Sequence, residues 1–189
     1  MRYTIDRRLS HEITEKTLQT LNHEILAALH WKKSNIHCTI AIHLDNSLPL
    51  GRGRVAHENG RHTIYIHPKP GNQNLVHTLR HEILHSVLKS RIRSKLDEYK
   101  IYLPVPKDYK KQTFRENLEE YIVRCVNASI ISQGLGKDWL KKQIEREIEQ
   151  GFSLMPYVIT FYRDWKKKMA PFSRETFIAL SHHLKNWNR

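Results

Sequence analysis

Two histidines and a glutamate that lie close together in the sequence are of the residue types that hold a metal ion and use it for hydrolysis. They are His81, Glu82 and His85, which form the pattern His-Glu-x-x-His. On an α-helix, residues i and i+4 lie one turn apart on the same face, so each imidazole can give one nitrogen to the same ion. Zinc suits two neutral imidazoles and a carboxylate, with a fourth position left for water. Because zinc lowers the pKa of that water, Glu82 can take its proton, and the pattern predicts a hydrolytic zinc site.

The residues around this pattern predict that it lies on a helix packed into the core. Apolar residues recur there at helical spacing: Leu75, Val76, Leu79, Ile83, Leu84, Val87 and Leu88. Such a stripe buries one side of an amphipathic helix. A short motif also arises by chance on exposed helices, so the stripe is what favours a metal site over a row of surface histidines.

A catalytic zinc site needs a third protein ligand besides the two histidines. The metzincin pattern puts a histidine six residues after the second motif histidine, and Arg91 occupies that position. Further along the chain the histidines are His182 and His183, close to its end, so a three-histidine site of the SprT type is not favoured. His77 lies one turn before the motif on the same face, where a third ligand from one straight helix fits a tetrahedral ion poorly. We therefore expect an acidic third ligand.

The acidic candidates lie on a second predicted core helix, over residues 114–132. At 100° per residue, its apolar side chains gather on one side; Glu120 lies nearly opposite them, and Glu119 lies at their margin. A helix that buries its apolar side and lines a polar cleft with the other favours Glu120 as the ligand. A ligand buried on the apolar side would favour Glu119, which remains the alternative. If Glu120 is the ligand, Arg124 is a candidate donor to the oxyanion that forms during hydrolysis.

Periodicity predicts the elements that must position these side chains. Helical spacing marks five further segments: 10–31 with Ser10 as its N-cap, 114–132, about 138–150, about 154–169, and a last helix capped by Ser173. Strict alternation predicts a strand over 36–44 with one buried face. Two shorter strands, 54–57 and 62–67, flank Asn59-Gly60, a strong hairpin signal. Pro104 and Pro106 favour a loop over 95–113 that covers the cleft.

These elements predict an α+β fold. A small mixed or antiparallel sheet with an edge hairpin is followed by the motif helix, the second ligand helix and a C-terminal helical region. We expect a core over residues 1–132 and a helical extension over 133–189 that packs on it. The strand over 63–67 is the predicted free edge, along which a substrate peptide would lie extended.

The motif together with a glutamate on a following helix resembles the gluzincin clan of zinc metallopeptidases. The compact order of elements over residues 10–132 is similar to that of the single-domain minigluzincins. The resemblance implies a zincin-like fold and peptide-bond hydrolysis, with zinc held by His81, His85 and Glu120 and with Glu82 as general base. The chain departs from the thermolysin-like Asn-Glu-x-x-x-Asp pattern, because Arg124 stands at the position of the aspartate.

The charge balance predicts an acidic partner. Lysine and arginine number 32 against 19 aspartates and glutamates, which gives a net charge of +13. The densest basic clusters are 89–95, 107–111 and 166–168. An acidic polypeptide substrate would suit this surface, and so would nucleic acid. The alternative function is therefore a basic nucleic-acid-associated or regulatory protein with a metallopeptidase-like fold and limited or no proteolysis.

Cysteine usage and hydropathy favour a cytoplasmic protein. Cys38 and Cys125 are the two cysteines, and we expect them to be free, buried thiols in a reducing compartment. No stretch approaches the roughly 20 apolar residues of a membrane span. The N-terminal residues lack the apolar segment of a signal peptide, so we expect none.

Overall fold

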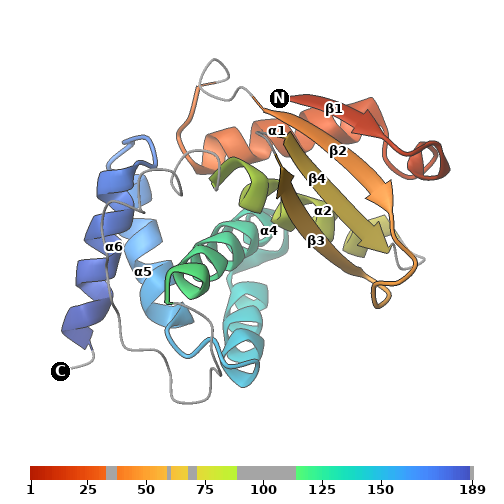
Figure 1. Cartoon of the computed structure of the whole chain (residues 1–189). Coiled ribbons are helices and arrows are strands. Elements are labelled where there is room, and N and C mark those ends of the chain that lie inside the picture. The colour runs from red at the N-terminus through yellow and green to blue at the C-terminus, as the bar shows by residue number, and fades with distance from the viewer. Residues whose placement is uncertain (33–37, 59–60, 68–71, 89–113, 188–189) are drawn as a thin grey trace. The chain divides into compact units, whose positions relative to one another are not determined.

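The computed structural model of this protein, drawn in Figure 1, consists of two compact units. The first unit comprises Met1–Ala27 and Trp31–Arg91, and the second comprises Ala28–His30 and Ile92–Arg189. The structure describes residues 1–32, 38–58, 61–67, 72–88 and 114–187, and it describes the side chains of these residues except at 72–74, 114–117 and 185–187. The predicted cleft loop and the basic clusters at 89–95 and 107–111 lie outside the described residues.

The first unit is built on a mixed four-stranded sheet, where the sequence predicted a small mixed or antiparallel sheet containing three of these strands. Its strands are β1 (Arg2–Ile5), β2 (Thr39–Leu44), β3 (Arg52–Glu58) and β4 (Arg61–His67), arranged in the order β1-β2-β4-β3. The β1–β2 and β2–β4 pairs are parallel, and β3 runs antiparallel to β4. The predicted hairpin is confirmed by the pairing of Glu58 with Arg61. Strand β1 was not predicted, because its four residues are too few for a distinct alternating pattern.

The predicted position of the sheet edge was wrong. Strand β4 pairs with β2 on one side and with β3 on the other, so residues 63–67 lie inside the sheet. Among the strands that the structure describes, the edge near the motif helix belongs to β3 instead. The burial pattern agrees with this order, because Ile64 and Ile66 of β4 are fully buried, whereas Arg52 and Arg54 of β3 are exposed.

One face of the sheet carries the core of the first unit. The buried residues of β2 and β4 pair across the strands and so share that face: Ile40, Ile42, His62, Ile64 and Ile66. Tyr3 of β1 lies on the same face and donates a hydrogen bond from its hydroxyl to Asn22 on α1 (Glu15–Ala28). Helix α2 (Asn72–Leu88) packs against β3 and β4. Both helices therefore cover one face of the sheet, as Figure 1 shows.

Helix α1 begins later than the sequence suggested. Residues Arg7–Leu9 form a 3-10 turn, η1, and the hydroxyl of Ser10 donates to the carbonyl of Arg7, so Ser10 is not the N-cap. Thr14 takes that place: its Oγ1 accepts from the backbone N–H of Thr17 at 3.1 Å. Threonine is also a good capping residue, and a pattern of letters alone does not decide between two nearby caps.

Helix α2 confirms the predicted apolar stripe. Leu79, Ile83 and Leu84 have no exposed surface, and Leu75, Val87 and Leu88 are also buried. On a neighbouring side of the helix, the guanidinium of Arg80 donates from Nε and Nη2 to one oxygen of Glu24 on α1, at 2.9 and 2.8 Å. Apolar packing and this ion pair fix the rotation of α2 about its axis, and with it the direction of the motif side chains.

The second unit is helical. Helix α4 (Phe114–Glu149) contains a break at Gly136, whose φ of 85° is outside the helical range, so it corresponds to the two helices predicted over 114–132 and about 138–150. It packs against α5 (Met155–Lys167), and α5 packs against α6 (Arg174–Trp187). Ser173 caps α6, accepting from the backbone N–H of Thr176, as predicted. In the same unit, Tyr162 of α5 donates to the carbonyl of Ala28.

Both cysteines are free and buried, as expected from the sequence. Burial raises the pKa of the thiols of Cys38 and Cys125 above the ordinary value, so both are held in the protonated, unreactive form. In the part of the chain that the structure describes, no helix has the length and apolar character needed to cross a membrane.

Candidate metal centre

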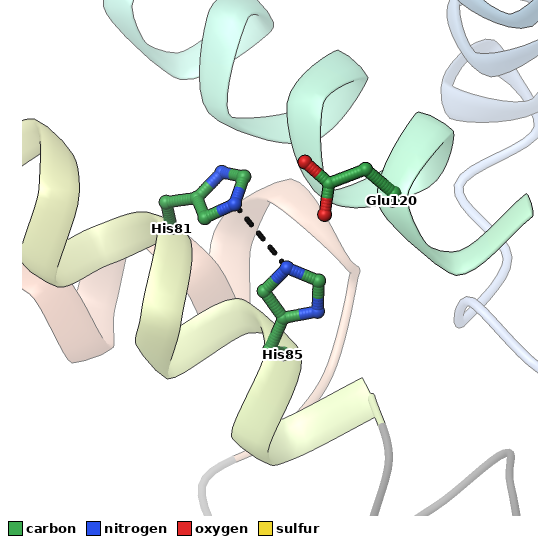
Figure 2. Close-up of side chains that lie close together, drawn as sticks. All are labelled: His81, His85 and Glu120. Carbon is green, nitrogen blue, oxygen red and sulfur yellow. Dashed lines mark hydrogen bonds between the residues drawn. The ribbon is translucent and has the colours of Figure 1, made fainter. Parts of the chain in front are cut away.

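Helix α2 turns the two motif histidines toward each other. The Nε2 atoms of His81 and His85 lie 3.2 Å apart, and the ring centroids are 4.8 Å apart with the planes at 74° (Figure 2). Both side chains are partly exposed, whereas the apolar stripe on the other side of α2 is buried. The helix therefore presents two imidazole nitrogens together at the edge of the core, as the i, i+4 spacing predicted.

This separation matches the geometry of one bound zinc ion. Zinc lies about 2.0–2.1 Å from each imidazole nitrogen, so two nitrogens at a tetrahedral angle are roughly 3.3 Å apart. The observed 3.2 Å between the two Nε2 atoms is close to that distance. The two side chains thus need little rearrangement to bind the same ion.

Glu82 lies on the buried side of α2, next to the first histidine. Only 6% of its surface is exposed. One turn further on, the fully buried hydroxyl of Ser86 donates to the backbone carbonyl of Glu82 at 3.0 Å. The carboxylate is thus largely withdrawn from bulk water, an environment in which it interacts strongly with a neighbouring charge or proton donor.

His77 is partly buried one turn before the motif. Burial lowers the pKa of its imidazole, and the neighbouring Arg80 lowers it further, while Glu24 opposes both. The neutral form is therefore favoured in the folded protein. His77 does not belong to the group of potential metal ligands around the motif, in agreement with the sequence analysis.

Glu120 and Arg124 lie one turn apart on α4 and form an ion pair. The Nε of Arg124 donates to Glu120 at 2.5 Å, and its Nη1 donates to Glu147 at 2.6 Å. The guanidinium also stacks over the ring of Phe152, 4.0 Å from the centroid. Burial lowers the pKa of Arg124, but the two carboxylates more than offset this, so the pKa stays above its ordinary value. The permanent cation therefore fixes the position of the Glu120 carboxylate.

Figure 2 draws Glu120 with the two histidines. Of the residues that the structure describes, His81, His85 and Glu120 form a group that could hold a metal ion, and all three side chains are partly buried. Glu119, the alternative third ligand from the sequence analysis, is also partly buried but is not in this group. Two imidazoles and one carboxylate form a donor set that suits zinc.

Glu147, near the far end of α4, binds Arg124 and was not predicted from the sequence. Glu147 is 6% exposed, and the side-chain amide of Gln143 donates to its second oxygen at 2.7 Å. From the sequence alone, a glutamate on an amphipathic helix is usually interpreted as a solvent-exposed charge. Arg124 and Glu147, which are 23 positions apart in the sequence, are brought together by the break at Gly136 and the packing of the helices, which local spacing does not encode.

Comparison of this chain with protein-family models, with curated proteins and with solved structures found no match. Membership of the gluzincin clan therefore stays a prediction from the motif and the order of the elements.

Proposed function

We propose that this protein is a zinc-dependent metallopeptidase of gluzincin type that hydrolyses peptide bonds. The observation that carries the proposal is the pair of imidazole nitrogens of His81 and His85, 3.2 Å apart on one helix, beside the buried carboxylate of Glu82. Two neutral imidazoles at this separation are suited to zinc, and an adjacent carboxylate is suited to accept a proton from water.

Glu120 is the proposed third ligand, and Arg124 is proposed to hold its carboxylate in position. A carboxylate that a partly buried cation holds in one direction binds a metal with less loss of side-chain freedom than a mobile one. Arg124 already donates to Glu120 and Glu147, and these contacts favour a role in positioning Glu120. The role of oxyanion donor, which the sequence also suggested for Arg124, remains a prediction.

Glu82 transfers the proton during hydrolysis, and the sheet binds the substrate. When bound, zinc supplies a Lewis acid that lowers the pKa of a water molecule. Glu82 accepts the proton of that water and passes it to the nitrogen of the leaving amine. The substrate peptide lies extended along the free edge of β3, where main-chain hydrogen bonds add it to the sheet as a further strand.

Metal analysis of matched variants tests this proposal. Protein purified without chelator is expected to contain about one zinc per chain, and added zinc is expected to raise the melting temperature of the metal-free form. His81→Ala and Glu120→Ala should weaken zinc binding, and Glu119→Ala is the matched control that should not. A protein without zinc, whose melting temperature zinc does not change, contradicts the proposal. Loss of zinc in Glu119→Ala but not in Glu120→Ala refutes only the choice of the third ligand.

The net charge of +13 supports a second candidate function. A basic nucleic-acid-associated or regulatory protein could keep a metallopeptidase-like fold with limited or no proteolysis. Binding to nucleic acid would then weaken steeply with salt, because cationic side chains that neutralise phosphates release counterions. Tight, salt-sensitive binding without cleavage of any polypeptide favours this second function over the first.

A further inference from the structure

Gly53 on the edge strand β3 lies directly against the side chain of Glu82. A Cβ placed on Gly53 would be 2.7 Å from Cγ of Glu82, 2.9 Å from Oε1 and 3.1 Å from Cδ. Real Cβ atoms essentially never approach another heavy atom closer than 3.0 Å. The space that a side chain at position 53 would fill is therefore occupied by the carboxylate arm of Glu82.

The backbone on either side of this contact has little freedom to move. Gly53 pairs with the fully buried Ile66 of β4, which holds β3 in register. On α2, the two residues that follow Glu82 in the sequence, Ile83 and Leu84, have no exposed surface. Because Cγ is the first atom beyond Cβ in Glu82, bending only the tip of the side chain does not relieve the overlap. The side chain would have to change its χ1 rotamer, a rotation of about 120° that carries the carboxylate away.

The backbone conformation of Gly53 does not itself require glycine. Its φ lies outside the positive range that side chains rarely adopt, so the contact with Glu82 is the obstacle to a larger residue. Glycine in a strand costs stability, and it often marks a place where another group approaches the backbone closely. Position 53 is such a place, and the group that approaches is the proposed general base.

We propose that Gly53 is a positioning residue for Glu82: the missing side chain on β3 leaves the room in which the general base is held. This inference rests on the proposed function for its catalytic meaning, but the contact itself is independent of that function. Since β3 is also the proposed substrate edge, the contact places the base against the strand along which the peptide would lie.

The first test measures the contact without using activity. Thermal unfolding of metal-free protein is compared for wild type, Gly53→Ala, Glu82→Ala and the double variant. Gly53→Ala is expected to lower the melting temperature by several degrees in the wild-type background and by less than about one degree in the Glu82→Ala background. Gly134→Ala is the matched control: no atom lies within 4 Å of a Cβ at that helical position, so its melting temperature should stay the same or rise slightly.

The second test measures the position of the base. Zinc content of Gly53→Ala should equal that of wild type, while kcat for a peptide substrate falls by about 10²-fold and KM changes little. The acidic limb of the pH dependence of kcat/KM should also shift, because the carboxylate that accepts the proton has left its site. In the Glu82→Gln background, Gly53→Ala should cause no further loss of activity.

Two results would overturn the inference. If the decrease in melting temperature of the double variant equals the sum of the decreases of the two single variants, Gly53 does not act through Glu82. A rise in KM with kcat unchanged would make Gly53 a substrate-docking residue instead. A wild-type protein that neither binds zinc nor cleaves peptides would contradict the proposed function, and the thermal comparison would still decide whether Gly53 and Glu82 interact.

Discussion

Among single side chains, Glu82 has the role that one substitution tests most directly. Glutamine keeps the shape of the side chain but does not accept a proton at neutral pH, so Glu82→Gln should reduce kcat by about 10²–10⁴-fold. Zinc content should be unchanged, because Glu82 is not a proposed ligand. Peptidase assays with metal analysis of the same samples check this expectation. Equal activity of the variant and the wild type would exclude Glu82 as the general base.

His77 should make the metal-free protein less stable in mild acid. Burial and the neighbouring Arg80 lower the pKa of its imidazole from the ordinary 6.5, so the folded form stays neutral where the unfolded chain already takes up a proton. The unfolded state then binds more protons, and stability falls as the pH drops below about 6.5 toward the folded-state pKa. His77→Gln should therefore lose less stability than wild type between pH 7.5 and about pH 5.5. Parallel urea-unfolding midpoints of the two proteins over this range would contradict the prediction.

Among the helices, α1 and α2 are joined by an ion pair whose two partners differ in burial. The side chain of Arg80 is 6% exposed and that of Glu24 is 31% exposed. Removing Glu24 takes one charged partner from a buried cation, whereas removing Arg80 leaves a carboxylate that water can reach. Glu24→Ala should therefore destabilise the protein by roughly 2–4 kcal/mol, and Arg80→Met by less.

Denaturant unfolding checks this order, with a surface pair as the control. Lys167 and Asp164 on α5 are 73% and 63% exposed, so Asp164→Ala should leave the unfolding midpoint nearly unchanged. A larger loss for Arg80→Met than for Glu24→Ala would show that packing of the arginine stem, and not the ion pair, holds α2 in place.

Over the whole molecule, the net charge of +13 should favour acidic substrates at low salt. The attraction weakens as added salt shortens the Debye length, from about 10 Å at 0.1 M to about 3 Å at 1 M. We expect kcat/KM for an acidic peptide to fall with salt more steeply than for a neutral peptide of matched length. Cleavage of both peptides across a salt series measures this, and a constant ratio of the two rates would mean that the charge does not steer substrates.

Features that depend on local spacing could be predicted from the sequence. Helical periodicity located α2 and its buried stripe, the i, i+4 spacing brought His81 and His85 together, and Asn59-Gly60 placed the hairpin between β3 and β4. These features arise from interactions between residues a few positions apart, so the letters contain the information needed to predict them.

Features that depend on packing between distant segments are visible only in the folded protein. It placed β4 inside the sheet and β3 at its edge, joined Arg124 to Glu147, and brought Gly53 against Glu82. Each of these contacts depends on which surfaces of the helices and strands pack together, and the sequence pattern allows several such pairings. The native pairing is the one that buries the apolar surface and pairs the buried charges over the whole fold. The spacing of residues along the chain does not contain this information.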